Sequence, residues 1–225
     1  MHLSWYGQAA FRIVDDAGRR IVCDPYDPEL LGFPPIDEPC DLVVTSSAND
    51  QAHCRHDLVP GEHAWVNALD VAREGGARTV DGLGIRAIES MEAEDHPTHD
   101  PEQNAMYRFV VDGLHVAHMG DIGNPLTERQ TRFLDGVDVL LALAGGPPVV
   151  PLDELVRVIG ATAPRLVVPM HHRTPLLVPP GLLEIEHFLA LVDPDTVDRA
   201  DASSATITRD TLPGHTRVLV LEQKV

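Results

Sequence analysis

Four short apolar runs restrict the fold of this chain more than any other feature of its sequence. Each consists of leucine, valine and alanine with at most one polar interruption, and they occupy residues 42–44, 114–117, 139–143 and 166–168. A strand with one face in water alternates apolar and polar side chains, whereas a strand covered on both faces is apolar throughout. The runs therefore predict buried strands in the interior of a sheet.

The order of strand and helix patterns differs between the two halves of the chain. Three short strands are predicted within residues 1–24, and the proline-rich, acidic stretch 26–39 is expected to form a surface flap or the rim of a site. From residue 126 onward, helical and buried-strand patterns alternate, which is typical of an open α/β sheet with its site at the strand ends. Further strands are predicted at residues 64–66, 78–80, 85–90, 105–111 and 217–221, and two of the apolar runs belong to strands that cover 137–144 and 165–170. Helices are predicted at residues 68–73, 126–134, 152–159 and 183–191.

Composition limits the classes of function. The net charge is −18 and Lys224 is the one lysine among 17 basic residues, so no basic stripe is available to bind a nucleic acid. No run of 18 apolar residues exists, which predicts that the chain does not enter a membrane. The cysteines Cys23, Cys40 and Cys54 lack C-x-x-C spacing, which argues against disulfides and a thiolate zinc site and favours a reducing cytoplasm. At this length we expect a single domain, residues 1–225.

Residues 112–123 end a predicted buried strand with a cluster of polar side chains. His115, His118 and Asp121 fall within seven residues, and glycines flank Asp121 on both sides. A carboxylate on a tight turn at the end of a strand is a common metal ligand. The alternative is a hairpin whose aspartate caps its own turn.

A second polar cluster follows the predicted strand that ends at Thr45. Asp50, His53 and His56 are spaced three residues apart. On one helical turn, Asp50 and His53 share a face and could bind one ion. The alternative is a capped helix start with surface histidines.

Two further stretches hold candidate ligands. The polar loop at residues 91–103 contains Glu92, His96 and His99, and a charged run of this kind usually solvates an edge, which is the interpretation that we favour for the two histidines. Gln8 lies between the first two predicted strands, where its side chain either points into a site or belongs to an ordinary turn.

Taken together, five segments resemble the metallo-β-lactamase fold superfamily, in particular its lactonase-like and uncharacterised metal-dependent hydrolases. The segments read WYGQAAFRIV, IVCDPY, NAMYRFVVDGLHVAHMGDIG, VDVLLALAGGPP and RLVVPMHHRTP. The resemblance implies an α/β (α+β) fold, a four-layer αββα sandwich of two similar halves. It also implies a site along the edge where the two sheets meet, in agreement with the polar strand ends.

The resemblance assigns three residues directly. Asp121 corresponds to the family's metal-bridging aspartate, His171 to its final histidine ligand, and His118 to a histidine that often precedes the Gly-Asp turn. Glu92 and Gln8 stand where the family has two other histidines.

The family's first motif, H-x-H-x-D-H, is degenerate. An alignment without gaps places Ser47, Asn49, Gln51 and Ala52 at the motif positions. A small shift instead keeps Asp50 and recovers His53 as a neighbouring histidine, and both registers stay open.

Counting ligands leads to the expected chemistry. A binuclear zinc site needs about seven protein ligands, and this chain offers only Asp50, His53, Asp121 and His171 for one site of mixed oxygen and nitrogen donors. We therefore expect one divalent ion, zinc with manganese or iron as alternatives.

Two functions remain. One is a metal-dependent hydrolase in which a metal-bound water attacks a small ester, lactone or phosphoester while His118 or Asp121 moves protons. The other is a non-catalytic relative with a decayed metal site that binds a small ligand. The expected partner is a small-molecule substrate, with neither nucleic acid nor membrane, and a homo-oligomer is left open.

Overall fold

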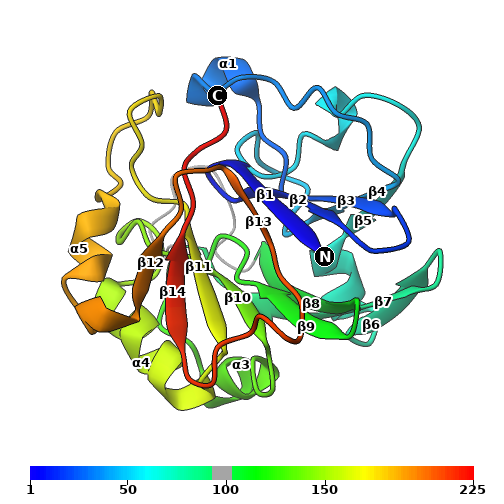
Figure 1. Ribbon diagram of the computed structural model, residues 1–225. Helices are drawn as coiled ribbons and strands as arrows, with labels where there is room; N and C mark the ends of the chain where they lie inside the picture. Colours follow the sequence, from blue (N-terminus) through cyan, green and yellow to red (C-terminus); the bar gives the residue numbers. More distant parts are fainter. Residues whose placement is uncertain (93–102) are drawn as a thin grey trace.

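Two β-sheets pack against each other in the computed structural model, which describes residues 1–92 and 103–225 (Figure 1). One apolar cluster contains buried side chains of both sheets, including Trp5 and Phe11 from the first and Leu140 and Val168 from the second. Helices and loops cover the outer faces. The expected αββα sandwich is therefore the fold that the chain adopts.

The first sheet has the order β13–β1–β2–β3–β4–β5 in the described part of the chain. The predicted opening meander is β1 to β3, which pair antiparallel, and β4 and β5 then continue the sheet in parallel. Its strands are β1 (His2–Gly7), β2 (Ala10–Val14), β3 (Arg20–Cys23), β4 (Leu42–Thr45), β5 (Ala64–Asn67) and β13 (Ser204–Thr206).

The second sheet has the order β12–β14–β11–β10–β9–β8–β7–β6 over the same described residues. From β9 to β12 in this order, adjacent strands are parallel, whereas from β6 to β9 adjacent strands are antiparallel. The strands are β6 (Ala77–Val80), β7 (Leu83–Ser90), β8 (Asn104–Val111), β9 (Leu114–His118), β10 (Val139–Leu143), β11 (Leu166–Met170), β12 (Val197–Arg199) and β14 (Arg217–Val220).

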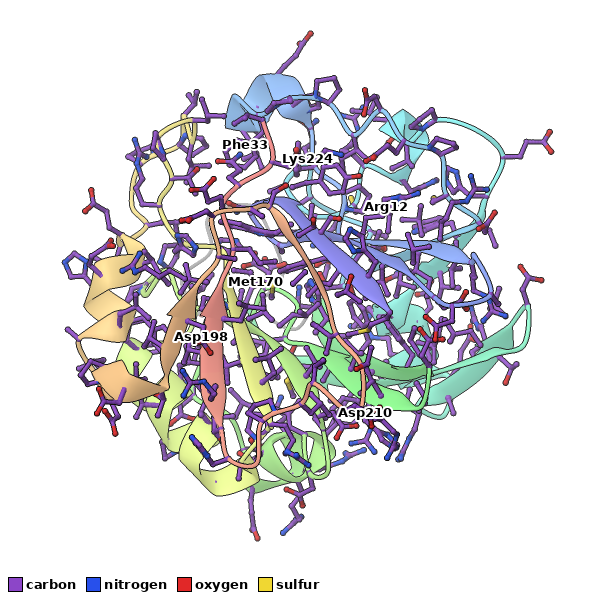
Figure 2. The ribbon with its side chains drawn as sticks, in the orientation of Figure 1. Arg12, Phe33, Met170, Asp198, Asp210 and Lys224 are labelled. Atoms are coloured by element: carbon purple, nitrogen blue, oxygen red, sulfur yellow. The ribbon has the colours of Figure 1, made fainter. Side chains whose placement is uncertain are left out.

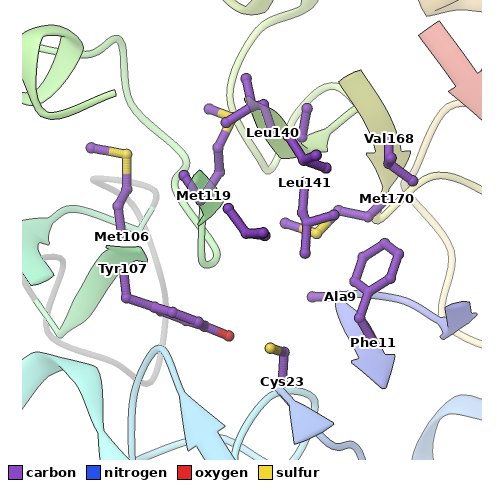
Figure 3. Packing of buried hydrophobic residues seen from close by; sticks show 14 of the residues in the cluster. Ala9, Phe11, Cys23, Met106, Tyr107, Met119, Leu140, Leu141, Val168 and Met170 are labelled. Carbon is purple, nitrogen blue, oxygen red and sulfur yellow. The ribbon is translucent and has the colours of Figure 1, made fainter. Parts of the chain in front are cut away.

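The four apolar runs lie where the sequence predicts them. All five side chains of β10 are buried, and so are all five of β11. Figure 3 shows Leu140 and Leu141 of β10 among Met119, Val168 and Met170 in the apolar interior. The prediction of interior strands covered on both faces is confirmed, because every apolar side chain of these runs is buried and only His115 is partly exposed.

The helices are short. They are α1 (Pro28–Leu31), α2 (Ala68–Arg73), α3 (Glu128–Phe133), α4 (Leu152–Thr162) and α5 (Ile185–Leu189), with 3₁₀ turns at His56–Leu58 and Pro194–Thr196. In α4, Leu155 and Val158 are buried, as the helical spacing of apolar residues requires. No described helix is long and apolar enough to cross a membrane.

The proline-rich stretch at residues 26–39 is more closely packed than a surface flap, and Leu30 forms part of the rim of the cavity described below, as the second expectation for this stretch had it. Tyr26, Leu31 and Phe33 are buried in a second apolar cluster with Val22 and Val43 of the first sheet. The stretch therefore forms an outer layer on that sheet, and the one-turn helix α1 begins at Pro28 after its Asp27 cap. Prolines that exclude regular structure do not exclude burial, because turns can pair their own backbone groups.

Candidate metal centre

Three strand ends from both sheets meet at one edge of the sandwich. His53 lies in the turn that follows β4 of the first sheet, while Asp121 and His171 follow β9 and β11 of the second. Positions far apart in sequence are therefore brought together by the packing of the sheets, as the fold predicts.

The three side chains converge on a common point. The Nε2 atom of His171 lies 3.1 Å from Nε2 of His53 and 3.2 Å from Oδ1 of Asp121. The Nδ1 atom of His53 lies 3.3 Å from Oδ2 of Asp121. One ligand atom from each of the three residues lies within 4.8 Å of the other two, and both histidines are buried. This is the spacing that a single ion bridges.

Tight backbone geometry places Asp121 and His171. Gly120 has a φ of 67°, and a Cβ there would lie 2.5 Å from the carbonyl oxygen of Ala105, so only glycine fits the turn. The Asp121 amide then donates to Oδ1 of Asn104 at 3.0 Å. His171 itself has a φ of 55°, an uncommon conformation for a residue with a Cβ, and its amide donates to the Gln8 carbonyl at 2.9 Å.

Asp50 supports His53 from outside the three-residue cluster. Its Oδ1 lies 3.3 Å from Nδ1 of His53, on the far side of the ring from Nε2. The Asp50 carboxylate also accepts from the Ala52 amide at 2.6 Å and from the Ser47 hydroxyl at 3.0 Å. These contacts favour the tautomer with a proton on Nδ1, which leaves Nε2 as a donor atom toward His171.

The shared helical turn expected for Asp50 and His53 is not formed. Residues 51–53 form a turn without helix, and Asp50 caps it by accepting from the amide two residues ahead. His56 lies in the following 3₁₀ turn, where its ring stacks on Trp65 with centroids 4.0 Å apart. His56 thus packs away from the cluster that His53 joins.

The cluster attracts positive charge. Burial by itself would lower the pKa of His53, but the facing carboxylates of Asp121 and Asp50 outweigh burial and raise that pKa well above its ordinary value. The protein therefore surrounds this position with groups that stabilise a cation, whether the cation is a proton or a metal ion.

Glu92 and Gln8 add oxygen and nitrogen atoms beside the cluster. Glu92 is buried, its Oε1 has no hydrogen-bond partner among the described residues, and burial, then Asp121 and Asp50, raise its pKa to about 8. Gln8 is also buried, and its Nε2 lies 2.7 Å from Nε2 of His171. Gln8 therefore lies in the turn between β1 and β2, as one interpretation expected, and its side chain also points into the site, as the other expected. His96 and His99 lie outside the described residues.

A cavity of about 420 Å³ opens beside these groups. It is lined by Leu30, Asn49, Asp50, Gln51, Ala52, His53, Glu92 and Asp121. The cavity gives a small molecule access to Asp121 and His53.

His118 does not belong to this cluster, which argues against its predicted role as a proton carrier. Its Nε2 donates to the Ala9 carbonyl at 2.9 Å, and its Nδ1 accepts from the Gly120 amide at 2.9 Å. The ring is buried and stacks on Tyr107 with centroids 4.8 Å apart. Because both nitrogens are held by backbone groups, His118 fixes the turn before Asp121 and has no lone pair or proton to offer a substrate.

Asp24 is a buried aspartate that sequence reasoning did not single out. Its carboxylate accepts from the Ser46 amide at 2.8 Å, the Ser46 hydroxyl at 2.6 Å and the Tyr107 hydroxyl at 3.0 Å. The signal in the sequence was the polar Asp-Pro pair directly after a buried strand. With these partners, Asp24 joins the two sheets beneath the metal centre.

The donors present fit one metal ion. His53, Asp121 and His171 supply two nitrogens and a carboxylate, a set suited to zinc, manganese or iron. Ser47 instead donates to Asp50, and Asn49 donates to Gln103 at 2.8 Å, so neither replaces an imidazole of the missing motif. Asp50 as a fourth ligand stays a prediction.

The family model for the β-lactamase superfamily domain matches residues 2–171. The chain therefore belongs to the metallo-β-lactamase superfamily.

Within that superfamily, a UPF0173 protein of Pyrococcus furiosus is 30% identical over 193 residues, covering 77% of this chain and 84% of the relative. A UPF0173 metal-dependent hydrolase of Thermoplasma acidophilum is 24% identical over 197 residues, with the same coverage of 77% and 84%. Among solved structures, a candidate Zn-dependent hydrolase of the superfamily from Thermotoga maritima superposes with a TM-score of 0.75 at 27% identity, covering 98% of this chain and 97% of that one.

Proposed function

We propose that this protein is a hydrolase that uses one divalent metal ion, zinc in the first instance, to cleave a small ester, lactone or phosphoester in the cytoplasm. The observation that carries the proposal is the convergence of His53, Asp121 and His171 on one point beside a cavity. The relatives named metal-dependent hydrolases support the same reaction class.

The residues divide the work between holding the ion and handling the substrate. His53, Asp121 and His171 would hold the ion, and Asp50 would keep Nε2 of His53 available by engaging its Nδ1. A bound divalent ion supplies a Lewis acid that acidifies water and polarises the bond to be cleaved. Glu92 presents its Oε1 in the same cavity, where that carboxyl can accept or release a proton.

Metal loading followed by elemental analysis tests the proposal. We expect at most one tightly bound ion per chain after incubation with zinc or manganese, and hydrolysis of simple p-nitrophenyl esters that depends on it. The Asp121→Asn variant should lose both the bound ion and the hydrolysis. The Asp210→Asn variant removes the same charge at an exposed position, labelled in Figure 2, and should keep both.

Two results would change the conclusion. Two tightly bound ions per chain would contradict the one-metal reading. No bound ion after loading would replace it with the non-catalytic, ligand-binding alternative.

A further inference from the structure

The cavity beside the metal centre carries a strongly one-sided charge. Three of its lining residues are acids, Asp50, Glu92 and Asp121, and among the described residues that line it there is neither lysine nor arginine. Apart from His53, the ionisable side chains among the described lining residues are therefore all carboxylic acids.

The nearest basic side chains in sequence are engaged elsewhere. Arg55, two residues after His53, donates to Asp57 at 2.9 and 3.0 Å and forms an ion pair with Asp27. Arg173 donates to the Pro179 carbonyl at 2.7 Å.

The chain's one lysine is engaged as well. Lys224, labelled in Figure 2, lies 2.7 Å from Glu38 and its ammonium is 4.7 Å from the centre of the Tyr6 ring. None of these cations lines the cavity.

This charge pattern matters most for anionic substrates. Enzymes that transfer or cleave phosphoryl groups neutralise the non-bridging oxygens with arginine, lysine or several metal ions. Here one divalent ion would be offset by the carboxylates of Asp121 and Asp50, whereas Glu92, with its pKa raised to about 8 by burial, is mostly uncharged at pH 7. Every further negative charge on a substrate then meets carboxylates at short range in a partly buried site.

One wall of the cavity is apolar. Leu30 of α1 lines the cavity and its side chain is exposed, although leucine is usually buried. A substrate whose acyl or alkyl group covers Leu30 would remove this apolar surface from water.

From these observations we propose that the site selects neutral or cationic carboxylic esters and lactones with an apolar group, and rejects anionic substrates, phosphoesters included. The inference rests on the proposed hydrolase function and narrows its substrate class. It assigns charge discrimination to Asp50 and Asp121, and the apolar contact to Leu30.

A pair of substrates that differ by one charge tests the selectivity. Dimethyl succinate is neutral, monomethyl succinate is an anion, and both present the same methyl ester. With the zinc-loaded protein, kcat/KM should be at least about tenfold higher for dimethyl succinate, since one like charge at close range costs on that order. For the same reason, kcat/KM should be higher for p-nitrophenyl acetate, which is neutral, than for p-nitrophenyl phosphate, which is an anion. An equal or reversed order would overturn the inference.

Charge variants identify the residues responsible. At saturating zinc, Asp50→Asn should narrow the ratio between the two succinate esters several-fold, because it removes one ionised carboxylate from the cavity wall. Glu62→Gln, an exposed change of the same net charge, should leave the ratio unchanged. If both variants change it equally, overall charge rather than the cavity sets selectivity.

Binding provides a readout that does not need turnover. Calorimetry with the zinc-loaded protein should show dimethyl methylphosphonate, which is neutral, binding at least about tenfold more tightly than the methyl methylphosphonate anion. Tighter binding of the anion contradicts the inference. If no ester is cleaved yet the neutral compound binds more tightly, the hydrolase function fails and the charge selectivity stands.

Discussion

Two groups of histidine and aspartate lie at this one edge of the sandwich, and they differ in what their polar atoms contact. In the first, His53, His171 and Asp121 point at one another across 3.1 to 3.3 Å. In the second, His118 and Asp24 bond backbone amides, a backbone carbonyl and hydroxyl groups.

The difference shows how a histidine that stabilises the fold can be distinguished from a histidine that coordinates a metal ion. The histidines of both groups are buried and both groups follow strand ends, so neither residue type nor the burial of the histidines separates them. His118 satisfies both nitrogens locally and therefore stabilises the turn. The donor atoms of His53 and His171 converge instead, an arrangement that an ion completes.

Removing Asp121 should produce the largest effect. Asp121→Ala takes away the carboxylate that faces both histidines, so we expect the bound metal to fall from one ion per chain to none, and hydrolysis to disappear with it. Elemental analysis after gel filtration measures the number of bound ions per chain. Retention of one tightly bound ion would show that the first group is not the metal centre.

His118→Asn should affect stability instead of metal content. Asparagine can still accept from the Gly120 amide but loses the bond to Ala9 and leaves a cavity, so the free energy of unfolding should fall by roughly 2–4 kcal/mol. Urea denaturation measures this change. The folded variant should still bind one ion. If the fully folded variant binds no ion, His118 is part of the metal centre after all.

Asp50→Asn should have an intermediate effect. The amide keeps the shape of the side chain but loses the charge that orients His53 through Nδ1. Metal affinity should drop by roughly 10 to 100-fold, the range that is typical when a residue hydrogen-bonded to a metal ligand is lost. Competition with a chromophoric chelator measures it, and a complete loss of binding would make Asp50 a direct ligand.

The smallest effect should be the contribution of His118 to acid sensitivity. Burial lowers the pKa of His118 from its usual value, and the Asp24 charge only partly opposes this. Below about pH 6.5 the unfolded chain then binds a proton that the folded chain does not, so stability is full above that pH and falls as pH drops, by at most about 1.4 kcal/mol per pH unit.

Denaturation of the metal-free protein between pH 7.5 and 5 checks this slope. The His118→Asn variant should show a shallower one, because its residue 118 does not titrate. Parallel slopes for the two proteins would contradict a neutral, buried His118.

The sequence predicted the framework because its signals are local. The continuous apolar runs at β10 and β11 can only be interior strands, and the polar residues after them must then share an edge. Together with the resemblance to the superfamily, these signals predicted that Asp121 and His171 share the edge, and that His53 joins them if the shifted register of the degenerate motif holds.

Other features depend on contacts between distant segments and left no local signal. The role of His118 is set by Ala9, more than a hundred residues away. Gln8 and Glu92 point into the site because of how turns close over it. The stretch at residues 26–39 looks like a loop in sequence and is buried because the outer face of the first sheet needs a cover.

The origin of the ligands in two different sheets has a further consequence. His53 belongs to the first sheet and Asp121 and His171 to the second, so a bound ion would act as a clamp across the sandwich. An ion that binds only the assembled form stabilises it by mass action, by about 2.7 kcal/mol at a free concentration one hundred times Kd. Metal supply would then govern how long the folded chain survives heat and proteases, even when no substrate is present.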